Sequence, residues 1–354
     1  MLTTHPEASP DTFPATVREP LRRAWAETLT AWLAEHTTGM ETAAAAYFDY
    51  STLGDRALNR PVTLLLGYGA TRKTLGPALL DELGPVALVP QAVRDLLAVH
   101  DDVVDGDPAK FDRPTLHRVI GDGAAVYTGD LLLGLIGDLV DQAPADIPTR
   151  YRLHRLIWRA IRRNQRGQLT ELALEQRHPA TIPTPVLEAL YADKAAEYCY
   201  ALPFELGTTL AGTHTRLRQL RPVLETIGVA SQIVDDLAGT CDGGKDTPGE
   251  LLHLRRTVLL THLAHHLTPH EPLTPLLAAT TADAETAAAV RTAFLTTGAA
   301  ATTAHRALEL ADHARQALHT LPLEGEALDY LHHLIDTRIT TRATQWAHRH
   351  GKAR

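Results

Sequence analysis

The sequence is poor in the features that mark several large classes of protein. Its 354 residues include only two cysteines, Cys199 and Cys241, too few for a disulfide framework or a zinc cluster. No uninterrupted apolar run approaches the roughly 20 residues that span a bilayer. The first residues, MLTTHPEASPDTF, have neither the basic nor the apolar region of a secretory signal. We therefore expect a cytoplasmic protein without a transmembrane segment.

Basic residues are also fewer than acidic ones, with 34 Lys and Arg against 42 Asp and Glu. The formal net charge is −8, whereas nucleic-acid-binding proteins usually carry a basic field, so we expect no nucleic-acid partner. A hydrophobic content of 44% excludes wholesale disorder, and the length is sufficient to bury a full core.

Aromatic residues make up only 5% of the chain, and runs with the period-two pattern of strands are nearly absent. Ala, Leu, Arg and Glu, which favour helices, dominate from Leu21 onward. We predict a flexible tail over residues 1–20 and a single all-α domain over residues 21–354. The segments of helical length lie near 21–36, 62–82, 86–105, 114–119, 123–142, 148–176, 184–210, 214–239, 250–267, 285–318 and 324–349.

Two acidic clusters stand out, HDDVVDGD at 100–107 and QIVDDLAG at 232–239. On a helix, Asp101 and Asp105 lie one turn apart on one face, and the apolar positions Ala92, Leu96, Val99 and Val103 lie opposite. Like charges at that spacing repel each other, which favours a cation between them. Carboxylates at a partly open site suit Mg²⁺, which takes its remaining ligands from water and substrate phosphates.

The second cluster repeats this pattern, since Gly228, Gln232, Asp235 and Gly239 share one small, polar helix face. A solvated helix end is the alternative interpretation. Both clusters lie at the carboxyl ends of apolar helices, however, where the helix dipole disfavours carboxylates. We therefore predict a metal site that uses Asp101, Asp102, Asp105, Asp235 and Asp236.

Further fragments, in their order and spacing, resemble the trans-isoprenyl diphosphate synthase (polyprenyl synthetase) family over roughly residues 50–260. The two acidic clusters resemble its two aspartate-rich motifs. The other fragments are Arg60-Pro61 (the end of GGKRxRP), Pro114 to His117 (PTxH), Gly129 to Leu132 (GDxLL), Gly167-Gln168 (GQ) and Lys194 to Tyr198 (KTAxY).

This resemblance implies an isoprenoid synthase-type helical bundle with a central cavity, in a homodimer. It also implies that three Mg²⁺ ions bridge the acidic clusters to an allylic prenyl diphosphate, whose diphosphate leaves to give an allylic cation. The implied catalytic residues are Asp101, Asp105, Asp235 and Lys194. Lys110, Gln232 and Lys245 would bind the diphosphate.

The half of the site that takes isopentenyl diphosphate in this family departs from the family pattern. Ala57 and Leu58 stand at the lysine and arginine positions of GGKRxRP. Arg94 replaces a histidine, and Phe111 replaces an arginine. A reduced anion site made of Arg56, Arg60 and Arg94 is what remains.

Two functions follow from these departures. A prenyltransferase with an atypical acceptor pocket would join the cation to a second molecule. A class I terpene synthase on the same fold would cyclise or quench it without isopentenyl diphosphate. We place transfer first, because arginines are retained or substituted in the acceptor half and because most members of the family are transferases. The resemblance also implies a substrate or product of C15 to C20 size, because Leu96 and Leu97 leave no aromatic block before the first motif. A purely regulatory subunit would be expected to lose the acidic clusters, which are intact here.

Overall fold

The protein is all-α, as predicted. The computed structural model describes residues 12–52, 58–71, 76–110, 113–241, 251, 253–268, 270–323 and 325–349. Within these ranges the strands are β1 (Ala109–Lys110) and β2 (Arg113–Pro114), an antiparallel pair in which Lys110 lies opposite Arg113. The chain divides into two compact units. The first comprises residues 1–161, 198–218 and 322–330, and the second comprises the remainder. From the sequence we expect one domain.

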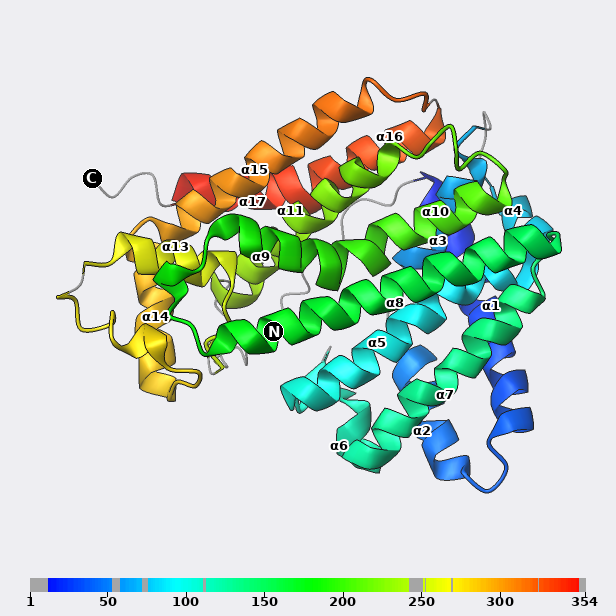
Figure 1. Cartoon of the computed structure of the whole chain (residues 1–354), viewed down its shortest axis with the longest axis horizontal. Coiled ribbons are helices and arrows are strands. Elements are labelled where there is room, and N and C mark those ends of the chain that lie inside the picture. Colours follow the sequence, from blue (N-terminus) through cyan, green and yellow to red (C-terminus); the bar gives the residue numbers. More distant parts are fainter. Residues whose placement is uncertain are drawn as a thin grey trace. The chain divides into compact units, whose positions relative to one another are not determined.

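The first unit contains α5, the helix that carries the first acidic cluster, packed against α7 (Figure 1). Its elements are α1 (Thr12–His36), α2 (Glu41–Thr52), α3 (Asn59–Gly69), α4 (Ala78–Leu83), η1 (Gly84–Leu88), α5 (Val89–Asp105), the strands, α6 (Leu116–Ile120), α7 (Asp122–Asp141), the first half of α8 (Ile147–Glu175), α10 (Leu202–Leu210) and the first half of α16 (Glu326–Leu334).

The second unit contains α11, the helix that carries the second acidic cluster, packed against α15 (Figure 1). Its elements are the rest of α8, η2 (Pro179–Thr181), α9 (Thr184–Tyr191), most of the π-helix η3 (Ala192–Ala201), α11 (Leu220–Cys241), α13 (Val258–His266), η4 (Leu276–Ala278), α14 (Ala284–Thr296), α15 (Ala299–Leu318), η5 (Ile335–Thr340) and α17 (Thr341–Arg349).

Helices α3 and α10 meet backbone to backbone in the first unit. A Cβ atom added at Gly67 would lie 2.3 Å from the carbonyl oxygen of Phe204, and one added at Gly207 would lie 2.1 Å from that of Leu64. Neither position therefore has space for a side chain. This contact packs a segment near residue 205 directly against one near residue 65.

The helix boundaries differ from the sequence predictions in several places, and the predicted segment 62–82, for example, is the two helices α3 and α4. The first helix begins at Thr12, so residues 12–20 are helical and not part of a tail. The run ETAAAAYFDYST forms α2, which we did not predict, because its alanines give no clear apolar periodicity. The predicted segment 285–318 is two helices, since Gly298 adopts a positive φ of 90° between them.

One helix in the described part of the chain, α7, is long and apolar enough to cross a membrane by length and composition alone. Core helices of soluble proteins satisfy the same criterion, and α7 packs against α5 and α6.

Candidate active site

The first acidic cluster ends α5 on the face opposite its buried apolar residues. Of the predicted apolar face, Ala92, Leu96 and Val99 are buried and Val103 is half-buried. The helix stops at Gly106, whose φ of 66° suits a glycine cap. Asp102 differs from its neighbour. It is only 1% exposed, whereas the side chain of Asp101 is 22% exposed.

Two donors hold Asp102 inside the first unit. The Tyr50 hydroxyl of α2 donates to Asp102 Oδ2 at 2.9 Å, and the Lys110 ammonium donates to Asp102 Oδ1. Lys110 Nζ also lies 3.7 Å from Asp101 Oδ2. The β1–β2 hairpin thus returns a cation to the acidic cluster, where it offsets the repulsion between adjacent carboxylates.

A second carboxylate, Asp95, is completely buried two turns earlier in α5. Gln91 Nε2 and Arg94 both donate to its Oδ1 at 2.9 Å, and the Ser51 and Tyr47 hydroxyls donate to its Oδ2. Four donors to one buried carboxylate satisfy it fully. Burial and the Asp95 charge also raise the pKa of the Tyr47 phenol well above its usual value.

Arg60 and Arg94 both lie close to Tyr198. The Arg60 guanidinium carbon lies 5.0 Å from the centre of the Tyr198 ring, and Nη2 donates to the Cys199 sulfur at 3.0 Å. Burial opposes the charge of each arginine, but Cys199 and Tyr198 raise the pKa of Arg60, and Asp95 and Tyr50 raise that of Arg94. Both predicted anion-binding residues therefore keep their charge.

The second acidic cluster, on α11, like the first, has one buried aspartate next to a more exposed one. Asp236 is 4% exposed and accepts a hydrogen bond from the Tyr191 hydroxyl and one of 2.8 Å from Gln232 Nε2. The side chain of Asp235 is 55% exposed, and Arg342 Nη1 of α17 donates to it at 2.7 Å. The Gln232 amide, which we predicted to bind diphosphate, is thus bonded to Asp236.

Lys194 lies in the π-helix η3, in the second unit. Its ammonium pairs with the Glu171 carboxylate of α8, and both side chains are 18% exposed. Lys194 is thus held in a largely buried ion pair at the position where the resemblance placed a diphosphate-binding lysine.

Three of the residues that the sequence singled out, Arg56, Phe111 and Lys245, lie outside the described residues. Among the residues that are described, no group of three or more His, Cys, Asp or Glu side chains is arranged to hold a metal ion. The donor set nevertheless fits Mg²⁺, because this ion is usually bound by one or two carboxylates together with water and phosphate oxygens. Asp101 and Asp235 carry such oxygens on side chains that are 22% and 55% exposed, and Asp105, one turn after Asp101, has a buried Oδ2.

Sequence reasoning missed Tyr50, Tyr191 and Arg342 as partners of the acidic clusters. Tyr191 also accepts a 3.1 Å hydrogen bond from the backbone N–H of Val258, and burial together with Asp236 raises its pKa well above the usual value. None of the three lies near its carboxylate in the sequence. Only the helical spacing of Tyr47 and Tyr50, within the overlooked α2, offered a signal.

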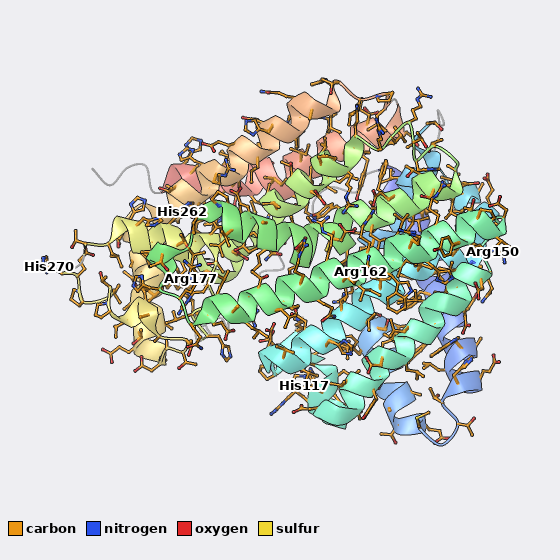
Figure 2. All side chains as sticks on the ribbon, viewed as in Figure 1. His117, Arg150, Arg162, Arg177, His262 and His270 are labelled. Atoms are coloured by element: carbon orange, nitrogen blue, oxygen red, sulfur yellow. The ribbon has the colours of Figure 1, made fainter. Side chains whose placement is uncertain are left out.

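Among the histidines in the described part of the chain, His262, labelled in Figure 2, has a strongly lowered pKa. Burial, together with the neighbouring His265 and His266, lowers its pKa to about 4, and its Nδ1 lies 2.8 Å from the Thr303 hydroxyl. His262 is therefore neutral at physiological pH.

Curated proteins similar to the chain match about half of it. It is 30% identical over 188 residues to the (2E,6E)-farnesyl diphosphate synthase of Mycobacterium tuberculosis, covering 51% of each chain. It is 27% identical over 180 residues to the geranylgeranyl diphosphate synthase of Sulfolobus acidocaldarius, covering 48% of this chain and 53% of that protein. The chain thus spans about half the length of the curated relatives it matches.

Solved structures match nearly the whole chain. The geranylgeranyl pyrophosphate synthase of Corynebacterium glutamicum, crystallised with isoprenyl diphosphate and magnesium, has a TM-score of 0.79 at 21% identity, over 94% of this chain and 99% of that one. The polyprenyl synthetase of Streptomyces coelicolor A3(2) has a TM-score of 0.77 at 22% identity, over 92% and 99%. These likenesses confirm the predicted isoprenoid synthase-type helical fold.

The family model described as polyprenyl synthetase matches residues 43–297 of the 354, well over half of the chain and more than the fragments indicated. Both acidic clusters and Lys194 fall inside this range. The chain therefore belongs to the polyprenyl synthetase family.

Proposed function

We propose that this protein is a prenyltransferase of the prenyl diphosphate synthase type, which ionises an allylic prenyl diphosphate and joins the cation to an acceptor. One repeated arrangement carries the proposal. In both acidic clusters one aspartate of the adjacent pair is packed inward on a tyrosine, and the other is more exposed, at 22% for Asp101 and 55% for Asp235. The names of the curated relatives support the same reaction class.

In this proposal Asp101, Asp105 and Asp235 hold the metal ions, which number three by the resemblance to the family, whereas Asp102 and Asp236 orient the clusters from inside. Bound Mg²⁺ would supply positive charge to the departing diphosphate. Lys194, Lys110 and Lys245 contribute further cations toward the same group, and Gln232 acts through Asp236. Fixed positive charges in a site of low dielectric stabilise the leaving group more strongly than water does.

The acceptor half uses Arg60 and Arg94, with Arg56 as a third candidate. Both described arginines retain donor groups beyond those bonded to Cys199 and Asp95, since a guanidinium has five N–H donors. An acceptor site with Arg60 and Arg94, and with Ala57 at the family's lysine position, carries fewer cations than the family's ordinary diphosphate cradle, so the acceptor pocket is atypical.

Chain length and assembly complete the proposal. Leu96 and Leu97 are buried at 2% and 4% exposure, and we retain the C15 to C20 range because neither is an aromatic block. Ile147, Tyr151 and Trp158 are 80%, 62% and 48% exposed on one face of α8, at spacings of four and seven residues. Large exposed apolar faces mark interfaces, so we assign this one to a second copy of the chain in a homodimer. The free thiols of Cys199 and Cys241 suit a cytoplasmic location.

One incubation experiment tests the reaction. The protein is supplied with farnesyl or geranylgeranyl diphosphate and Mg²⁺, with and without isopentenyl diphosphate, and the products are identified by mass spectrometry. Transfer predicts an elongated diphosphate that forms only when the acceptor is present. A hydrocarbon or alcohol formed without the acceptor would instead establish the terpene synthase alternative, and no diphosphate release in any arm would reject both.

A further inference from the structure

The backbone around Lys194 is held to α8 on several sides. Lys194 is the third residue of the π-helix η3, and π-turns inside α-helices are frequent at functional sites. Its ammonium faces Glu171 of α8. Other residues of α8 contact the main chain of Lys194 and not its ammonium.

Asn164 of α8 bonds directly to that main chain. Its Nδ2 donates to the backbone carbonyl oxygen of Lys194 at 2.8 Å, and the residue is only 3% exposed. A carbonyl oxygen has two lone pairs and can accept such a bond in addition to a helical one. The amide of Asn164 therefore fixes the distance between α8 and the Lys194 backbone.

Gly167, one turn further along α8, also lies against the backbone of Lys194. A Cβ atom added there would lie 3.0 Å from the Lys194 backbone nitrogen and 3.1 Å from its Cβ. Such contacts are tighter than side chains ordinarily make, so even alanine would displace η3. The Gly-Gln pair singled out in the sequence thus has a steric role at Lys194.

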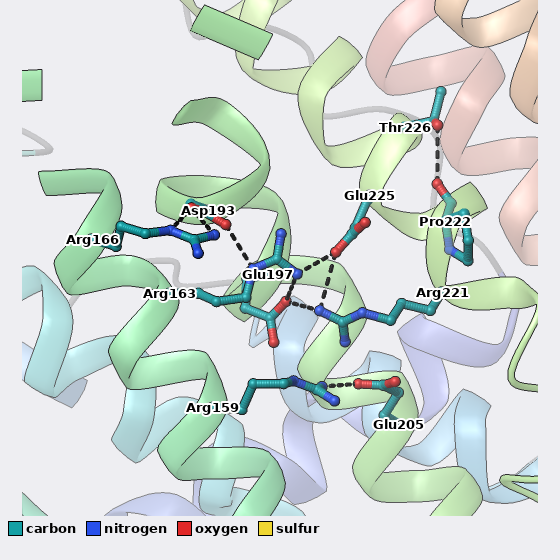
Figure 3. Close-up of polar contacts among 10 residues, drawn as sticks. All are labelled: Arg159, Arg163, Arg166, Asp193, Glu197, Glu205, Arg221, Pro222, Glu225 and Thr226. Carbon is teal, nitrogen blue, oxygen red and sulfur yellow. Dashed lines mark hydrogen bonds and ion pairs between the residues drawn. The ribbon is translucent and has the colours of Figure 1, made fainter. Parts of the chain in front are cut away.

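An ion cluster clamps the residues on either side of Lys194 (Figure 3). Arg163 and Arg166 of α8 both donate to Asp193. Arg163 and Arg221 both pair with Glu197, whose side chain is fully buried. The same two arginines also pair with Glu225 of α11. Asp193, one residue before Lys194, and Glu197, three residues after it, are therefore tied to α8, and a shift of η3 would break these charge pairs.

We propose that Asn164 and Gly167 are positioning residues that set the place of the Lys194 ammonium in the diphosphate site. The inference rests on the proposed function, in which Lys194 binds the diphosphate of the allylic substrate. Glu171 holds the same ammonium in the absence of the substrate. Asn164 and Gly167 fix the Lys194 backbone and so limit how far the lysine side chain has to move when the substrate binds.

A double-mutant cycle tests the proposal. Asn164→Leu keeps the approximate size of the side chain and removes the donor. In the otherwise unchanged protein we expect about a three- to tenfold rise in the KM for the allylic diphosphate, as loss of one hydrogen bond predicts. In the Lys194→Ala background the same substitution should change KM less than twofold, because the group that it positions is gone. Binding of inorganic pyrophosphate with Mg²⁺, measured by calorimetry, should follow the same pattern.

Thr170→Ala is the matched control, since that hydroxyl donates only within α8 as far as the described contacts show, to the carbonyl of Arg166. It should leave KM unchanged. Gly167→Ala provides a second variant with the same expected dependence on Lys194, and circular dichroism checks that both variants fold. An equal change of KM by Asn164→Leu in both backgrounds would overturn the positioning role of Asn164 and Gly167 while leaving the proposed function intact. An unchanged KM in Lys194→Ala itself would overturn the proposal that Lys194 binds diphosphate, and with it the positioning role of Asn164 and Gly167.

Discussion

Arg342 donates a hydrogen bond of 2.7 Å to Asp235, although 107 residues separate them in the chain. The arginine lies in α17 and the aspartate in the second acidic cluster, on α11. The pair is half-exposed, with side-chain exposures of 34% and 55%, so its contribution to stability is no more than about 1 kcal/mol. The Arg342 guanidinium is thus bonded to Asp235, a carboxylate that we propose as a metal ligand.

This pair predicts a change in the magnesium requirement. Arg342→Gln removes the competing cation, so the Mg²⁺ concentration for half-maximal activity should fall by about two- to fivefold. A magnesium titration at saturating substrate measures it. A higher requirement in the variant would show that Arg342 assists binding of the metal or the diphosphate.

The adjacent aspartates of the first cluster should give different phenotypes. Asp101→Asn should lower kcat by roughly 10²-fold with little loss of stability, because the carboxylate is at the helix surface. Asp102→Asn should cost about 1–3 kcal/mol of unfolding free energy, because the buried partner of Tyr50 and Lys110 loses its charge. Steady-state kinetics and urea denaturation measure the two effects. Equal kinetic losses in both variants would contradict the division between surface and buried carboxylates.

Tyr191→Phe should destabilise the protein by about 1–3 kcal/mol, since the buried Asp236 loses a donor and the Val258 N–H loses its acceptor. The measurement is the free energy of unfolding in urea. Tyr127→Phe is a suitable control, because Tyr127 is 75% exposed and should change stability by less than about 0.5 kcal/mol. Similar losses in both variants would remove the special role of the Tyr191 hydroxyl.

His262 predicts a dependence of stability on pH. Its pKa is about 4 in the folded protein, so between pH 6.5 and 4 the unfolded chain binds a proton that the folded chain does not. The folded state should therefore lose about 1–3 kcal/mol as the pH falls through this range, an estimate reduced for the partial exposure of the ring. The charged and titratable groups facing it are His265, His266, Glu188 and Arg306.

His262→Gln removes this titration, so its stability should approach that of the natural protein as the pH falls from 6.5 to 4. Urea denaturation at several pH values measures the difference. His270→Gln, at an exposed position, should run parallel to the natural protein (Figure 2). A constant difference between His262→Gln and the natural protein would contradict the assignment.

The exposed face of α8 predicts the assembly. Tyr151→Glu combined with Trp158→Glu should convert a dimer to a monomer, because charges would be buried at an apolar interface. Analytical ultracentrifugation measures the mass. Leu276→Glu, at an exposed apolar position elsewhere, should leave the mass unchanged. A monomer before any substitution would reject the assignment of this face.

Helical periodicity accounts for what could be predicted of the fold and the site. The spacing of Asp101 and Asp105 and the apolar positions opposite them follow from 3.6 residues per turn, and α5 has that arrangement. The same rule could not show that Asp102 and Asp236 turn inward, since this depends on Tyr50 and Tyr191, 52 and 45 residues away. Local pattern specifies which face a residue occupies, whereas the partner on that face comes from tertiary packing.

The return of Lys110 onto Asp102 shows a different limit. The seven residues between them include the helix stop at Gly106 and the start of the hairpin, and only the complete turn brings the ammonium to the carboxylate. Arg94 shows a third limit. Its helical position was predictable, but its bond to the buried Asp95 depends on α2, which the sequence did not reveal.

The glycine contact between α3 and α10 has a consequence for synthesis of the chain on the ribosome. Gly67 and Gly207 are 140 positions apart, so α3 has no partner for its bare backbone face until translation has passed residue 207. A nascent chain that pauses earlier would expose Leu64, Leu65 and Leu66, all fully buried in the finished protein. Chaperones that recognise short apolar stretches would therefore have their main opportunity to bind α3 during this interval.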